Sequence, residues 1–129
     1  MAVWMDGTEA KIFRLRAEAF DESTVHSPAH HLHRHPKDQK TRTHNHPDDQ
    51  HHFFRDLAAA LKGADQILIV GPAVTKLVFL RYLQKNEPAL DARVVGLETV
   101  DHPTDRQVVA YVREYFQQTP ANVQPEPRL

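Results

Sequence analysis

Histidines are the residues of this chain whose number and spacing point most directly to chemistry. The sequence holds ten histidines, and nine of them lie between His26 and His52. Adjacent pairs, such as His30 with His31, and i,i+2 pairs recur among them, and the candidate metal ligands are His31, His33, His35, His44, His46, His51 and His52. A neutral imidazole ring binds zinc, copper or nickel, and such pairs can share one ion where the chain is extended or turned. The pattern predicts binding of zinc or nickel, although we expect no cofactor to be required.

The same segment supports two other interpretations. It matches no defined zinc motif, and the chain has no cysteine to supply a thiolate. Its cationic residues, Arg34, Lys37, Lys40 and Arg42, can follow the phosphates of RNA, more strongly as the histidines protonate near about pH 6. Its only aliphatic residues are Ala29 and Leu32, so it cannot form part of a core. A metal site, an RNA-contacting loop and a solvated loop all stay open.

A second candidate feature is the sequence Gly71-Pro72, followed by Lys76. Glycine permits a sharp turn from a strand into a helix, and proline suits a helix start. Amide groups at a helix start, together with a lysine one turn in, can hold a phosphate. An ordinary strand-to-helix turn explains the same residues, and a Walker-type loop is excluded because its glycine spacing is missing.

Carboxylates give a weaker signal for catalysis. Asp6 follows the first apolar run, and Glu98 and Asp101 follow the last one. A two-metal nuclease would place such residues at one sheet edge, but the first predicted helix offers only Asp56 as a partner. His102 lies in a strand-to-helix turn and is interpreted as a turn histidine. We therefore predict no catalytic residues.

The elements that must position these residues alternate between strands and helices. Strands are predicted at 2–6 and 10–16 around Gly7, weakly at 23–26, and at 66–71 and 92–100; helices are predicted at 48–62, 73–86 and 104–117. Gly63 fits a helix C-cap, and Thr104 with Gln107 has capping-box spacing. This order predicts an α/β fold, a three-layer α/β/α sandwich with a mixed sheet. The run at 66–71 should be an interior strand.

Length and composition limit the number of domains and the expected cellular location of the protein. A chain of 129 residues fits one domain, here 1–117, with the His-rich loop at about 26–47 and a flexible tail at 118–129. The net charge of -1 argues against a strongly basic nucleic-acid binder. Without cysteines, a signal peptide or a long apolar run, we expect a cytoplasmic protein and no membrane partner. The helix at 73–86 is apolar on more than one face, which leaves a homodimer open.

The segment ILIVGPAVTKLVFLRYL resembles the strand, Gly-Pro, lysine and helix unit in the central domain of archaeal and eukaryotic release factors and Pelota. The opening AVWMDGTEAKIFRL resembles the hairpin of that domain, which has a ribonuclease H-like layout. The resemblance covers roughly residues 2–117 and extends to small bacterial stand-alone relatives grouped as translational machinery components. In release factors a loop in the place of the histidine segment carries Gly-Gly-Gln, but this segment contains no glycine.

The resemblance implies a non-enzymatic binding module that contacts the ribosome, tRNA or a translation factor, without release activity. The alternative is a metal-binding or metal-sensing protein that uses the His-rich loop. A hydrolase is the third hypothesis.

Overall fold

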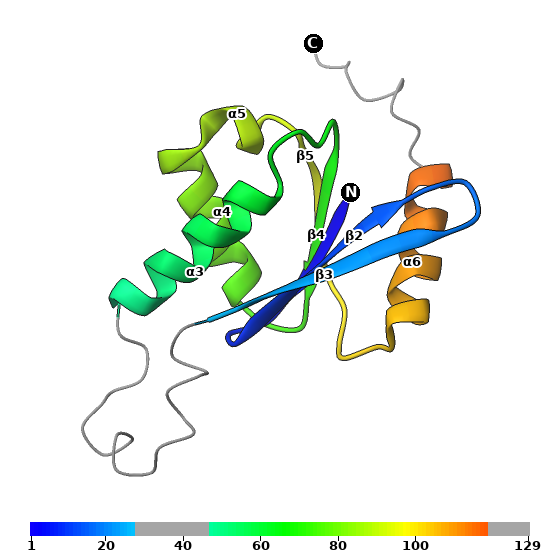
Figure 1. The fold of residues 1–129 in the computed structure, drawn as a ribbon, viewed down its shortest axis with the longest axis horizontal. Coiled ribbons are helices and arrows are strands. Elements are labelled where there is room, and N and C mark those ends of the chain that lie inside the picture. The colour runs from blue at the N-terminus through cyan, green and yellow to red at the C-terminus, as the bar shows by residue number, and fades with distance from the viewer. Residues whose placement is uncertain (28–46, 119–129) are drawn as a thin grey trace.

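The computed structural model describes residues 1–27 and 47–118 (Figure 1). The elements follow in the order β1 (Ala2–Met5), β2 (Glu9–Leu15), β3 (Phe20–His26), α3 (Pro47–Ala60), β4 (Ile67–Gly71), α4 (Thr75–Asn86), α5 (Pro88–Asp91), β5 (Val94–Thr99) and α6 (Asp105–Gln118). Within this described part, no helix is long and apolar enough to cross a membrane.

The strands form one mixed sheet in the order β3-β2-β1-β4-β5. β1 pairs antiparallel with β2 and parallel with β4, so that Trp4 lies opposite Lys11 on one side and Val70 on the other. β4 lies between β1 and β5, and all its residues are buried. The predicted mixed sheet and the predicted interior strand are both confirmed.

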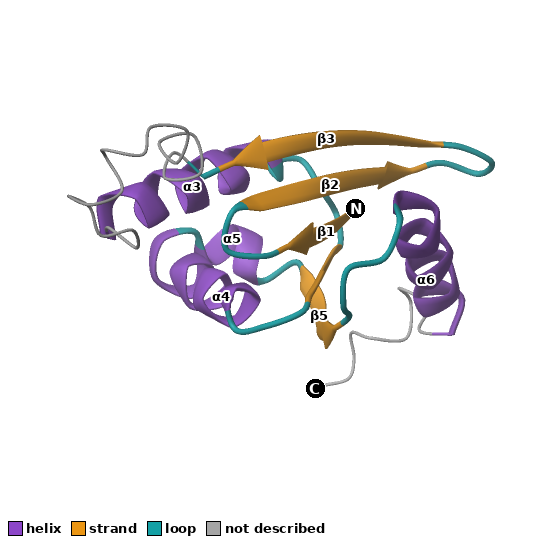
Figure 2. Ribbon diagram, turned by 90° about the horizontal axis from the view of Figure 1, so that it is seen from below, coloured by secondary structure: helices purple, strands orange, loops and turns teal. Residues whose placement is uncertain are grey.

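Helices cover both faces of the sheet. α3, α4 and α5 lie on one side and α6 lies on the other (Figures 1 and 2). Alternate residues of β1 therefore enter different cores. Val3 and Met5 pack with α3 and α4, whereas Ala2 and Trp4 pack with the valines of α6. The three-layer α/β/α sandwich is confirmed, and β1 contributes to both of its interfaces.

Two predicted starts were wrong, and one short helix was missed. β3 begins at Phe20 rather than at 23, because it pairs with the whole of β2, from Leu15 opposite Phe20 to Glu9 opposite His26. α4 begins at Thr75 rather than at 73, so three residues separate Gly71 from the helix. Pro88 does not only stop a helix. It occupies the first turn of the short helix α5, where the missing N–H costs nothing.

The predicted capping box at the start of α6 is confirmed. The Thr104 N–H donates to Gln107 Oε1 at 2.8 Å, and the Gln107 N–H donates to Thr104 Oγ1 at 3.2 Å. The helix predicted to end at Lys62 ends at Ala60, and Gly63 lies three residues further on with a φ of 93°, in the left-handed region that glycine adopts without strain. The apolar helix α4 buries Phe79 and Leu83, but Val78 is exposed on its surface.

Gly96 allows α6 to approach β5 closely. The Tyr115 hydroxyl donates to the Val95 carbonyl at 3.1 Å, and a Cβ on Gly96 would overlap that hydroxyl. Burial raises the pKa of Tyr115, and the nearby charge of Glu98 raises it further. The folded state therefore holds the phenol proton more strongly than the unfolded chain does.

This coupling predicts a loss of stability at alkaline pH. Because the folded pKa lies above the unfolded value of about 10, the contribution of Tyr115 is complete below about pH 10 and disappears as the pH rises through the folded pKa. Urea unfolding of the wild type and of Tyr115→Phe from neutral to alkaline pH checks this. The stability advantage of the wild type should shrink above about pH 10. The raised pKa of Lys11 lowers the stability of both proteins equally at alkaline pH, so two parallel curves would contradict the assignment.

Candidate binding site at the carboxyl edge of the sheet

The carboxyl ends of the parallel strands β1, β4 and β5 lie at one edge of the sheet. From β1 the chain continues to β2 on one side, and from β4 it continues to β5 on the other side. Open α/β sheets bind ligands at such a switch point, outside the carboxyl ends of the strands. The loops at 6–8, 72–74 and 100–104 meet there. A ligand-binding site is therefore expected at this edge.

Backbone contacts hold the three loops together. A Cβ on Gly71 would overlap the Met5 carbonyl oxygen, so β4 approaches the end of β1 more closely than any other residue type permits. The Gly71 carbonyl accepts a hydrogen bond from the Val100 N–H at 3.0 Å. On the other side, a Cβ on Gly7 would lie at ordinary contact distance, 3.7 Å, from Thr75 Oγ1.

His102 lies between two carboxylates at this edge. Its Nε2 is 3.7 Å from Asp6 Oδ2, and its Nδ1 is 3.1 Å from Asp101 Oδ1. The Trp4 indole N–H donates to the Asp101 carbonyl at 2.8 Å, and the Trp4 ring meets the His102 ring edge to face, with centroids 5.2 Å apart. Since 63% of the His102 side chain is exposed, the ring is a surface group that joins two loops.

The Asp6 carboxylate also stabilises the turn between β1 and β2. Its Oδ1 accepts hydrogen bonds from the Thr8 N–H at 2.9 Å, the Thr8 hydroxyl at 3.0 Å and the Glu9 N–H at 3.0 Å. This Asx-turn arrangement explains why an aspartate follows β1, without invoking a metal. Within residues 1–27 and 47–118, no three acidic or histidine side chains are placed to hold a metal ion, so Asp6, Glu98 and Asp101 form no such group.

A polar pocket of about 150 Å³ lies beside His102. Its lining residues are Trp4, Glu9, Lys11, His102, Pro103, Asp105 and Val108. Lys11 Nζ donates to Asp105 Oδ1 at 3.1 Å. This hydrogen bond raises the pKa of Lys11, and the charges of Asp105, Glu9 and Glu22 raise it further. The Lys11 ammonium group is thus paired with Asp105, and the charges of Glu9 and Glu22 act on it from further away.

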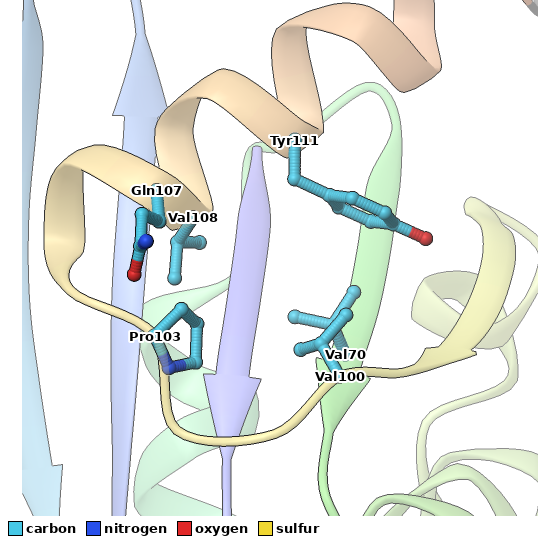
Figure 3. A pocket seen from close by; sticks show the side chains of 6 residues that line it. All are labelled: Val70, Val100, Pro103, Gln107, Val108 and Tyr111. Atoms are coloured by element: carbon cyan, nitrogen blue, oxygen red, sulfur yellow. The ribbon is translucent and has the colours of Figure 1, made fainter.

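A second, apolar pocket of about 220 Å³ lies under α6 (Figure 3). It is lined by Val70, Val100, Pro103, Gln107, Val108 and Tyr111. Pro103 and Val108 line both pockets, so the polar and apolar pockets adjoin. The sequence reasoning missed this pair. The register that places Trp4 beside Lys11 could have been read from the hairpin, but the position of α6 over β1 and β4 could not.

Of the predicted phosphate-binding residues, Gly71 ends β4, Pro72 begins the turn to α4, and Lys76 is the second residue of α4. Lys76 is only 7% exposed, however, and its ammonium group donates to the Ala73 carbonyl. Among the described residues, no carboxylate lies within ion-pair distance of it. The close approach of Met5 accounts for Gly71 without a ligand, and the phosphate site stays a prediction.

The predicted histidine site is only partly described. His51 meets the Tyr82 ring edge to face at 5.4 Å, and His52 Nδ1 accepts from the Arg55 guanidinium at 2.7 Å. Each therefore has a partner other than a metal. The remaining predicted ligands and RNA-contacting residues lie outside the described residues: His31, His33, His35, His44, His46, Arg34, Lys37, Lys40 and Arg42.

Comparison with known proteins supports the fold. No family model and no curated protein matches the chain. Among solved structures, Pelota from Archaeoglobus fulgidus matches 88% of the chain with a TM-score of 0.61 and 16% identity. Pelota from Thermoplasma acidophilum matches 87% with a TM-score of 0.59 and 23% identity. The chain spans only 30% and 31% of those two proteins. The resemblance to a domain of Pelota, predicted from the Gly-Pro-lysine unit and the hairpin, is therefore confirmed at the level of the fold.

Proposed function

We propose that this protein is a non-enzymatic, cytoplasmic binding module of the translation apparatus, which contacts the ribosome, tRNA or a translation factor. The observation that carries the proposal is the fold shared with Pelota over 88% of the chain. The local match of Gly71, Pro72 and Lys76 to the release-factor unit supports it. A release reaction is not proposed, because the histidine segment contains no glycine and therefore no Gly-Gly-Gln.

Sedimentation of the untagged protein with ribosomes tests this function. At low salt we expect the protein in the ribosomal fractions of a sucrose gradient. Raising the salt from about 50 to 200 mM should move it to the top, because lysine and arginine side chains that bind phosphate release counterions. Free tRNA, added in excess, should compete if tRNA is the partner.

A matched pair of variants locates the contact. Replacing Arg34, Lys37, Lys40 and Arg42 together by glutamine should weaken the association strongly. The control replaces four exposed cations of α3, α4 and the turn after α3 by glutamine: Arg55, Lys62, Arg81 and Lys85. It changes the net charge equally and should leave the association intact. A protein that stays at the top of the gradient at every salt concentration, and that free tRNA does not shift, would refute the proposal.

A further inference from the structure

The apolar pocket under α6 has the form of a site for one side chain. Val70 and Val108 form its buried floor, Val100 and Pro103 its walls, and Tyr111, which is 36% exposed, stands at its mouth. In Figure 3 these side chains converge from the sheet, the loop after β5 and α6. Its volume of about 220 Å³ is below the roughly 300–1,000 Å³ of sites that enclose small ligands. One bulky aliphatic or aromatic side chain of a partner is a better match in size.

The surface around the two pockets is acidic. Glu98 is close enough to raise the pKa of both Tyr111 and Tyr115. On the other side, the carboxylates around Lys11 exceed the single charge of its ammonium group. Four further carboxylates lie here, Asp6, Glu9, Asp101 and Asp105, against the ammonium group of Lys11 and the imidazoles of His26 and His102, which lie beside Glu9, Asp6 and Asp101. A phosphate backbone would be repelled here, whereas lysine or arginine side chains would be attracted.

We propose that this face binds a short, basic segment of a protein partner, which inserts one bulky apolar side chain into the pocket and places its cationic neighbours against the carboxylates around it. The inference rests on the proposed function and narrows it, because it assigns this face to a protein contact and leaves RNA contacts to other surfaces. Apolar insertion supplies the affinity, and the acidic surroundings select the charge of the flanking residues.

Binding of short capped peptides tests the proposal with the whole chain. The probe is the pentapeptide Lys-Lys-Leu-Lys-Lys, and the comparison peptides are Lys-Lys-Ser-Lys-Lys and Glu-Glu-Leu-Glu-Glu. We expect saturable binding of the first peptide, and binding at least about tenfold weaker for each of the others. In ¹H–¹⁵N spectra the amide shifts should cluster in residues 98–111. The indole N–H of Trp4, the sole tryptophan of the chain, should shift with them, since Trp4 lines the adjoining pocket.

Two variants and one control assign the binding to the pocket. Val100→Phe fills the cavity and should weaken binding about tenfold. Should that variant fail to fold, Tyr111→Ser, at the exposed mouth, provides the same test. The control Val78→Phe changes an exposed valine of α4 on the opposite side of the sheet and should bind normally. Glu98→Gln combined with Asp101→Asn should weaken binding and reduce its salt dependence.

Several results would overturn the proposal. These are equal binding of the serine or glutamate peptide, unchanged binding by the pocket variants, and amide shifts centred outside 98–111. Self-association of the free protein through this face, lost in Val100→Phe, would instead identify a second copy as the occupant. Ribosome sedimentation of the same variants distinguishes a failure of this inference from a failure of the proposed translation function. If the protein sediments with ribosomes but ignores the peptides, only this inference fails. If the peptides bind and sedimentation is absent, the proposed translation function fails.

Discussion

Gly71→Ala is expected to destabilise the protein by about 3 kcal/mol, more than most single substitutions do. The added Cβ would overlap the Met5 carbonyl oxygen, which is backbone and belongs to a strand paired with β4. A side chain could rotate away from such a clash, but here the strands must separate. Their separation would also strain the hydrogen bond between the Gly71 carbonyl and the Val100 N–H.

Urea unfolding followed by far-UV circular dichroism measures this loss. Gly7→Ala is the matched control, since it adds the same methyl group at the same edge but meets only Thr75 Oγ1 at 3.7 Å. Its stability should stay within about 1 kcal/mol of the wild type. If Gly71→Ala and Gly7→Ala unfold at the same denaturant concentration, Gly71 has no steric role and its place before Lys76 needs another explanation.

Trp4→Ala is expected to cost about 3–5 kcal/mol, the range of large aromatic deletions in a core. The ring is 5% exposed and belongs to the cluster between the sheet and α6, which includes Phe13, Val108 and Val112. Its removal would also leave the Asp101 carbonyl without the indole donor and the His102 ring without its aromatic partner. The loop between β5 and α6 should therefore loosen together with the core.

Trp4→Phe separates these contributions. It keeps most of the apolar volume but removes the indole N–H, so it should cost about 1 kcal/mol for the hydrogen bond, plus a smaller packing loss. Thermal and urea unfolding by circular dichroism compare the three proteins. A Trp4→Ala protein as stable as Trp4→Phe would show that the ring does not carry the packing of α6.

The succession of elements was predictable because each carries a local signal. The apolar run ending at Gly71 could only be a covered strand, and the cap at Thr104 uses neighbouring residues. The length of β3 was not predictable, since Phe20 to Glu22 are polar or isolated in the sequence and gain their strand conformation by pairing with β2. α5 was missed because the signal that ends α4, Pro88, also begins a helix.

The candidate site was less predictable than the fold. Asp6, Glu98, Asp101 and His102 were noticed as single residues, but their arrangement depends on three loops that meet only in the folded sheet. The sequence reasoning correctly placed Gly71 at the end of a strand and Lys76 in the helix that follows it. It could not show that the Lys76 ammonium group is directed at the Ala73 carbonyl, because burial of a lysine depends on neighbours distant in sequence.

The central place of β1 has a consequence for synthesis of the chain. This strand leaves the ribosome before every element that covers it, and its parallel partner β4 follows about sixty residues later. The three-stranded meander of β1, β2 and β3 can form early, because its contacts are local in sequence. The face of the meander that carries Trp4 and Phe13 remains exposed to solvent until α6 has been synthesised. A nascent chain halted before residue 105 therefore presents that apolar surface to chaperones.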